Sequence, residues 1–168
     1  MSYTVSLAKC GSYNQSEVDS SAGKLLDNLG GISKFIKKGQ KILLKPNVVS
    51  AMRPEEAGTT HPAVVEAVIK ILKEQNCEIL IGDNPFSEDA IGAMKTCGIY
   101  SVCKKNGVEI AVFDKKINAL NEKALVVREF PLTHYFNEVD TIINIPKLKT
   151  HSQLYFTGAV KNLYSIMP

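Results

Sequence analysis

The sequence has no long apolar run, no secretion signal and little excess of charge of either sign. Its longest apolar stretches are Ile79–Ile81 and Thr141–Ile145, far short of the roughly 20 residues that a membrane-spanning helix needs. Residues 1–10 lack the basic segment followed by an apolar segment that marks a signal peptide. The 20 basic and 17 acidic residues leave a net charge of only +3, which gives no electrostatic case for nucleic-acid binding. We therefore predict a soluble, cytoplasmic protein that binds neither nucleic acid nor membranes.

The four cysteines are not arranged in a metal-binding or redox motif. Cys10, Cys77, Cys97 and Cys103 include no Cys-x-x-Cys pair and no Cys/His pair at zinc-finger spacing. Iron–sulfur clusters favour closely spaced cysteines, so we do not expect these four alone to hold one. The last three lie among apolar neighbours, which favours small buried side chains in a reducing compartment.

The motifs of several common enzyme classes are also missing. The sequence contains no GxxxxGK[ST] phosphate loop, GxSxG turn, HExxH helix or GxGxxG loop. No internal repeat or linker divides the 168 residues, so we expect a single α/β domain over residues 1–168. An apolar helical turn formed by Leu163, Tyr164 and Ile166 directly precedes the last residue. It predicts a fragment of a longer protein that lacks the C-terminal half, and such an apolar edge can promote a homodimer.

Strand-like and helix-like segments alternate along the chain. We predict strands at residues 3–8, 41–44, 78–81, 109–113, 124–127 and 141–145. Helices are predicted at residues 18–36, 62–75, 87–96, 100–105, 132–137 and 158–164, with Ser87 as the N-cap of the third. The clearest is 62–75, where Val64, Val68 and Leu72 recur every four residues. The alternation predicts an α/β fold with a mainly parallel sheet and helices on both faces, a Rossmann-like layering.

Polar residues collect directly after three of the predicted strands. Lys45-Pro46-Asn47 follows the strand at 41–44, Gly82-Asp83-Asn84-Pro85 follows 78–81, and residues 146–151 (Pro-Lys-Leu-Lys-Thr-His) follow 141–145. Ligands of open α/β sheets bind outside the carboxyl ends of the strands. These three segments therefore predict a ligand site.

The cationic and amide side chains of these segments are typical of a site for an anion. Lys147 and Lys149 would point the same way in extended backbone and offer two ammonium groups to one ligand, although two solvated loop lysines would give the same pattern. A turn into a helix at residues 157–162 adds backbone N–H groups and a further lysine. The predicted anion-binding residues are Lys45, Asn47, Lys147, Lys149, Thr157, Gly158, Lys161 and Asn162.

Three titratable side chains are candidates for catalysis. His151 can act as a general acid or base, although a lone histidine is more often structural. His61 stands where a Ser, Thr, Asn or Asp normally caps a helix that begins with Pro62, unless Thr60 is the cap. Asp83 is the acid among the three strand ends and can act as a base, bind a metal or merely cap a turn. These three lie far apart in sequence, so whether they hold a metal depends on the fold.

The same motifs carry a resemblance to a known family. Lys45-Pro46-Asn47, Thr60-His61-Pro62, the Gly82–Pro85 segment, Pro-Lys-Leu-Lys-Thr-His at 146–151 and Thr-Gly-Ala-Val-Lys-Asn-Leu at 157–163 occur in order. They resemble the domain of unknown function family 362, whose members are often labelled uncharacterised iron–sulfur proteins. Family domains continue past the Lys-Asn-Leu helix, so the resemblance implies the N-terminal portion of such a protein. Any [4Fe–4S] cluster would then be held by cysteines outside this chain.

Two functions follow as hypotheses. The first is a domain of an iron–sulfur-linked redox enzyme, in which the lysines hold a small ligand bearing a phosphate or carboxylate and a histidine moves a proton. The second is a ligand-binding or electron-transfer accessory domain without chemistry of its own. Replacing both histidines separates them, because turnover would vanish under the first and ligand affinity would survive under the second.

Overall fold

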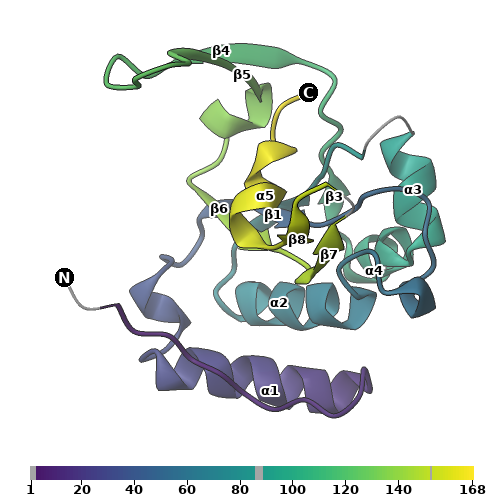
Figure 1. The fold of residues 1–168 in the computed structure, drawn as a ribbon. Coiled ribbons are helices and arrows are strands. Elements are labelled where there is room, and N and C mark those ends of the chain that lie inside the picture. Colours follow the sequence, from purple (N-terminus) through teal and green to yellow (C-terminus); the bar gives the residue numbers. More distant parts are fainter. Residues whose placement is uncertain (1–2, 86–88, 152) are drawn as a thin grey trace.

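The core of the molecule is a parallel β-sheet of four strands (Figure 1), seen in a computed structural model that describes residues 3–85, 89–151 and 153–168. The spatial order of the strands is β3-β2-β1-β6. The sheet comprises β1 (Lys41–Pro46), β2 (Glu78–Ile81), β3 (Glu109–Ile110) and β6 (Thr141–Ile145). All three strand pairs are parallel, so the predicted α/β fold with a parallel sheet is confirmed.

Helices cover both faces of the sheet because successive residues of β1 point to opposite sides. Ile42 and Leu44 pack in one cluster with α2 (Pro62–Glu74), α3 (Ala90–Thr96) and α4 (Ile99–Asn106). Leu43 packs in a second cluster with Phe113 and Ile166. On that side lie α5 (Ala159–Tyr164) and the 3-10 turn η3 (His134–Asn137), as Figure 1 shows. The predicted layering is therefore confirmed.

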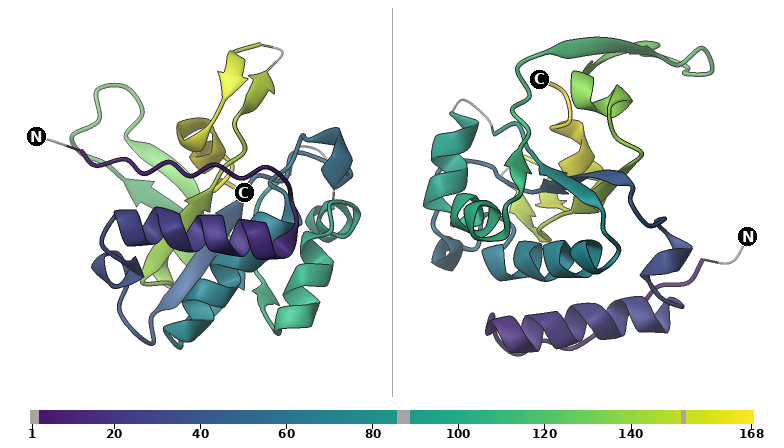
Figure 2. Two further views of the ribbon diagram at one scale, coloured as in Figure 1. Left: turned by 90° about the horizontal axis from the view of Figure 1, so that it is seen from below. Right: turned by 180° about the vertical axis from the view of Figure 1, so that it is seen from behind.

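Helix α1 (Gln15–Asn28) forms an outer layer against α2 (Figure 2). Val18 of α1 is buried against Ala63 and Ala67. The prediction of one helical region over 18–36 is wrong beyond residue 28. Gly30 and Gly31 have φ angles of +93° and +89°, a backbone region that breaks a right-handed helix, and only the short 3-10 turn η1 (Ile32–Lys34) follows.

The prediction of a strand at residues 3–8 is wrong. This segment is extended but joins no sheet within the described residues, and it runs along α1 (Figure 2). Ser21 of α1 donates a hydrogen bond to the carbonyl of Lys9, and Asn28 donates one to Ser6. The side chains of Val5 and Leu7 are 79% and 87% exposed. Their alternation matches a strand, but no strand in the described ranges pairs with it.

Two antiparallel hairpins extend from the sheet (Figure 1). One pairs β4 (Lys116–Leu120) with β5 (Glu129–Thr133), and the other pairs β7 (Lys149–His151) with β8 (Tyr155–Thr157). The strand predicted at 124–127 is wrong, because these residues form the loop of the first hairpin and Leu125 is 98% exposed. Neither hairpin was predicted, because none of their four strands was expected from the sequence.

The remaining elements agree with the predictions to within a few residues. Helix α2, strands β2 and β6, and helix α5 begin and end close to their expected bounds, whereas the strand at 109–113 and the helix at 132–137 are shorter than predicted. A 3-10 turn, η2 (Pro54–Glu56), lies in the loop after β1. Ser87 lies outside the described residues, and Asp89 caps α3 by accepting hydrogen bonds from the N–H groups of Ile91 and Gly92. No helix in the described part of the chain is long and apolar enough to cross a membrane.

Candidate functional site

A groove of about 1460 Å³ lies at the carboxyl ends of the sheet strands. Its walls come from five parts of the chain: the loop after β1, the segment after β2, the hairpin β7–β8, helix α5 with the residues that follow it, and strand β5 with the loop before it. The groove therefore stands where strand-end ligands bind in open α/β sheets. Its polar lining includes Asn47, Lys149, His151, Lys161 and Asn162.

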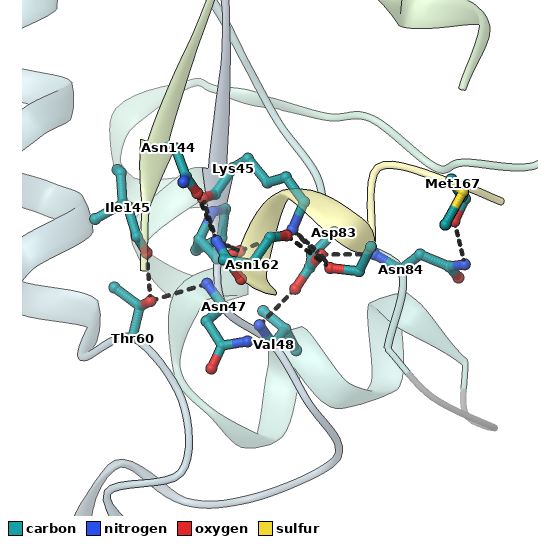
Figure 3. Close-up of polar contacts among 12 residues, drawn as sticks. Lys45, Asn47, Val48, Thr60, Asp83, Asn84, Asn144, Ile145, Asn162 and Met167 are labelled. Carbon is teal, nitrogen blue, oxygen red and sulfur yellow. Dashed lines mark hydrogen bonds and ion pairs between the residues drawn. The ribbon is translucent and has the colours of Figure 1, made fainter. Parts of the chain in front are cut away.

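The floor beneath the groove contains a buried ion pair (Figure 3). The ammonium group of Lys45, at the end of β1, contacts the carboxylate of Asp83, which follows β2. The two side chains are 0% and 1% exposed. Burial lowers the pKa of Lys45, and the negative charge of Asp83 opposes that effect. Removing either charge would leave the other one buried without compensation.

Further hydrogen bonds saturate the carboxylate of Asp83. The backbone N–H of Val48 donates to Oδ2 at 2.6 Å, and that of Asn84 donates to Oδ1 at 2.9 Å. The hydroxyl of Ser165 donates to Oδ1 at 2.7 Å and accepts from the Lys45 ammonium at 2.8 Å. Asp83 thereby holds together the segments that follow β1, β2 and α5. This arrangement matches the structural alternative for Asp83, because its acceptor oxygens are already occupied.

Asn162 of α5 ties this helix to the sheet (Figure 3). Its Nδ2 donates to Oδ1 of Asn144 in β6 at 2.7 Å and to the carbonyls of Lys45 and Pro46 in β1 at 3.2 and 3.3 Å. Asn84 adds a bond from its Nδ2 to the carbonyl of Met167 at 2.8 Å. Helix α5 has only six residues, so these side-chain bonds hold it in place.

Asn47 is held at the groove through its backbone. Its N–H donates to Oγ1 of Thr60 at 2.9 Å, and its carbonyl accepts from the N–H of Thr60 at 2.9 Å. The Thr60 hydroxyl in turn donates to the carbonyl of Ile145, at the end of β6, at 2.7 Å. Thr60 therefore joins the ends of β1 and β6 and does not cap α2.

The predicted anion-binding lysines lie in different surroundings. Lys149 is half-buried in the groove wall and its ammonium donates to the carbonyl of Gly58. Burial lowers the pKa of Lys149, and the charges of Lys147 and Lys161 lower it further, against an opposing effect of Asp83. Lys161 is exposed, with Nζ 5.2 Å from the ring centre of Tyr164.

Lys147 lies at the other side of the strand ends, outside the groove lining. Its Nζ donates to the hydroxyl of Tyr13 at 3.1 Å and lies 5.6 Å from the centre of that ring. Lys147 and Lys149 thus have different neutral partners. Their charges are still close enough for Lys147 to lower the pKa of Lys149.

His61 is the N-cap of α2, and its Nδ1 accepts a hydrogen bond from the N–H of Ala63 at 3.2 Å. The imidazole stacks on Tyr13 with ring centres 3.7 Å apart and an interplanar angle of 9°. Burial lowers the pKa of His61, and the charge of Lys147 lowers it further. His61 does not line the groove.

His151 lines the groove at the end of β7. Its Nδ1 accepts from the N–H groups of Gln153 and Leu154, both at 3.2 Å, so this nitrogen is used to form the hairpin turn. The buried Thr157 of β8 also lines the groove, and Gly158 is the N-cap of α5.

The structure does not gather the cysteines. Cys97 and Cys103 are buried in the core under α3 and α4, where burial raises the pKa of both thiols, that of Cys103 to about 12. Cys10 is exposed near the N-terminus, and Cys77 contacts the carbonyls of Lys37 and Gln75. Among the described residues, no three His, Cys, Asp or Glu side chains are placed to hold a metal ion. Within the part of the chain that the structure describes, the four cysteines therefore do not fit an iron–sulfur cluster.

Sequence reasoning missed two residues of the floor, Ser165 and Asn144. Ser165 stands as a lone hydroxyl within an apolar helical turn, and Asn144 stands alone inside the apolar strand 141–145. A polar side chain in a buried apolar element needs a hydrogen-bond partner, and that signal was available in both places.

Comparisons with known proteins agree with the resemblance seen in the motifs. The sequence model of the family described as Domain of unknown function (DUF362) matches residues 42–168. Thylakoid-associated protein sll1697 of Synechocystis sp. is 33% identical over 165 residues. That alignment covers 98% of this chain and 51% of the relative, so the chain spans about half the relative's length. No solved structure matches the chain significantly.

Proposed function

The chain belongs to the DUF362 family, and we propose that its groove binds a small ligand that carries a phosphate or carboxylate group. The observation that carries this proposal is the pair of cations in the groove wall, Lys149 and Lys161, at the carboxyl end of a parallel sheet. Within the described residues neither lysine forms an ion pair, and Lys149 has a neutral carbonyl as its partner.

The charges around the groove favour an anion. The buried carboxylate of Asp83 forms its ion pair with Lys45, so it does not form one with Lys149 or Lys161. The lining contains two acidic side chains, Glu56 and Glu129. The carboxylate of Glu56 accepts a hydrogen bond from the backbone N–H of Arg53 and forms a 3.7 Å ion pair with its side chain. Glu129 is therefore the acidic side chain of the lining whose charge Arg53 does not offset. An anion between Lys149 and Lys161 would relieve the repulsion that lowers the pKa of Lys149.

We extend the proposal to catalysis only for His151, the histidine that lines the groove. Its Nδ1 accepts from backbone N–H groups, which leaves Nε2 as the nitrogen that can exchange a proton with a ligand. A non-catalytic ligand-binding or electron-transfer domain remains the second candidate. Replacement of His151 with Asn, which can still accept the hydrogen bonds of the hairpin turn, distinguishes them: a loss of turnover with unchanged ligand affinity indicates that this side chain moves a proton.

The iron–sulfur-linked redox role is proposed for a longer protein, since the cysteines of this chain do not fit a cluster. The relative is about twice as long as this chain, so it has residues outside the matched part that could hold a cluster. Iron and sulfide analysis of a protein of the relative's full length tests this part. Cell fractionation tests the predicted cytoplasmic location against the association with thylakoids that the relative's name states.

Thermal unfolding in the presence of anions tests the binding proposal. A ligand present at 100 times its dissociation constant adds about 2.7 kcal/mol to the free energy of unfolding, which is a measurable shift in Tm. Inorganic phosphate, propyl phosphate and propionate are suitable probes. We expect Lys149→Met and Lys161→Met to reduce the shift and Lys24→Met, an exposed lysine of α1, to leave it unchanged. Equal shifts in all three variants would place the anion elsewhere.

A further inference from the structure

Two side chains in the groove lining carry a buried oxygen that has no hydrogen-bond donor. They are Asn47 and Asn162, and the Oδ1 atom of each accepts no hydrogen bond among the described residues. The hydroxyls of Thr59 and Thr133 are also buried without partners, but neither residue lines the groove. Buried polar atoms in native proteins are almost always paired with protein, ordered water or a ligand, so the two amide oxygens are free acceptors for a donor on a bound molecule.

The orientation of the Asn162 amide is fixed by its surroundings. Its nitrogen faces three acceptors, which are Oδ1 of Asn144 and the carbonyls of Lys45 and Pro46. Exchanging nitrogen and oxygen would place an acceptor against three acceptors, so the oxygen must point away from them. The side chain is only 4% exposed, and this orientation does not depend on solvent.

The amide of Asn47 is not needed to hold its loop. The backbone of Asn47 is fixed by its two hydrogen bonds with Thr60, and its side chain makes no hydrogen bond among the described residues. A half-buried amide that contributes nothing to its own loop is therefore available to a bound molecule.

We infer that the ligand is an anion that also carries hydrogen-bond donors, of the polyol phosphate or hydroxy acid class. This inference rests on the proposed function, because Lys149 and Lys161 hold the anionic group. Lysine only donates hydrogen bonds and an amide oxygen only accepts them. The ligand must therefore present acceptors to the lysines and hydroxyl or amino donors to Asn47 and Asn162.

Matched ligand pairs separate the two parts of this recognition. Glycerol 3-phosphate and propyl phosphate differ by two hydroxyls, and glycerate and propionate differ in the same way. Titration calorimetry on the 168-residue chain gives a dissociation constant for each. We expect the hydroxylated member of at least one pair to bind about tenfold more tightly, which corresponds to about 1.4 kcal/mol for the added hydrogen bonds.

Asn47→Ala is the informative variant, because the lost amide supports no other contact. It should lower the affinity ratio within the pair to the part that Asn162 contributes, while binding of propyl phosphate or propionate stays within about twofold. Asn118→Ala, an exposed asparagine of β4, is the matched control and should keep the full ratio. Binding of both members with equal affinity, or a ratio unchanged in Asn47→Ala, overturns the inference and leaves the proposed function standing. Binding of neither member of either pair overturns both.

Discussion

Lys45 and Asp83 form an ion pair in which neither side chain is more than 1% exposed. They come from neighbouring parallel strands, and the ammonium group also donates to Ser165. Each charge is tolerated in the interior because the other one is present, together with the hydrogen bonds from Val48, Asn84 and Ser165 to the carboxylate.

Replacement of one member of this pair should be strongly destabilising. We expect Lys45→Met to lower the free energy of unfolding by about 3–5 kcal/mol, because the carboxylate of Asp83 is left buried without its counter-ion. Urea denaturation followed by circular dichroism measures the change. Lys41→Met is the matched control on the same strand, since the solvent-accessible Lys41–Glu78 pair should contribute much less to stability than the buried pair. Similar losses in the two variants would contradict the assignment.

The double variant Lys45→Met/Asp83→Leu tests the same relationship from the other direction. With both charges removed, no uncompensated ion remains in the floor. We expect its loss of stability to be smaller than the sum of the two single losses. Additive losses, measured in the same double-mutant cycle, would show that the two charges do not compensate each other.

His61 should make the stability of the protein depend on pH. The folded state lowers the pKa of His61 below the ordinary value of 6.5, so the unfolded chain binds the proton more tightly. Stability is then complete above pH 6.5 and is lost as the pH falls through the lower pKa of the folded state. Protonation also removes the Nδ1 acceptor that caps α2. Urea denaturation between pH 8 and pH 5 measures this effect.

His61→Asn is the control for that measurement, because asparagine retains a cap acceptor and does not titrate. We expect this variant to lose the part of the acid sensitivity that arises from residue 61. His61→Ala should in addition lose about 1 kcal/mol at pH 8 through the missing cap. If wild type and His61→Asn respond identically to acid, His61 does not titrate differently in the folded state.

Replacing each of two glycines with alanine should change the free energy of unfolding in opposite directions. A Cβ at Gly82 would lie 2.5 Å from the carbonyl oxygen of Ala111 and 2.6 Å from the ring of Phe113, so Gly82→Ala should destabilise the protein by about 1–3 kcal/mol. Gly23 lies within α1 with no atom within 4 Å of the added carbon, and Gly23→Ala should stabilise by about 0.5–1 kcal/mol. Thermal unfolding of the two variants checks the pair. A stabilised Gly82→Ala would disagree with the close approach at the end of β2.

Anion binding should weaken as the pH rises, at a pH below the one at which an exposed lysine loses its charge. The pKa of Lys149 is lowered by burial and by its lysine neighbours, so its charge is lost earlier than that of an exposed lysine. Propionate keeps its charge between pH 7 and pH 10, and its affinity should therefore fall as Lys149 deprotonates. Calorimetric titration at several pH values gives the midpoint. Lys149→Arg, which stays protonated, should remove the decline.

The sheet could be predicted from sequence because its strands are short apolar runs with helices between them. Residues 42–44 and 79–81 are buried on both faces, and Val64, Val68 and Leu72 mark α2 by their spacing. The hairpin β7–β8 could not be predicted in this way. Its turn leads into Tyr155 at φ +61°, a conformation that aromatic residues seldom adopt, and the segment contains no Asn-Gly or Asp-Gly signal.

The gathering of polar residues at the strand ends could be predicted from the sequence, but the pairs that they form could not. The polar residues after β1, β2 and β6 meet because the carboxyl ends of parallel strands share one edge. The sequence does not indicate that Lys45 is fully buried, since lysine is rarely buried without a partner, and the partner is 38 residues away. Nor does it indicate that Asn162 reaches the backbone of β1.

The contacts of Ser165 also fix the order in which the molecule can be completed. Ser165 forms hydrogen bonds with Lys45, 120 residues earlier, and with Asp83, 82 residues earlier. Neither hydrogen bond can form until Ser165 has been synthesised. At about 5–20 residues per second, the ribosome adds Ser165 roughly 4–16 s after Asp83. During that interval β1 and β2 can pair while the ends of Lys45 and Asp83 still face water. The nascent chain can therefore pair β1 with β2 well before its groove forms, and any ligand that depends on α5 binds only after Ser165 has been added.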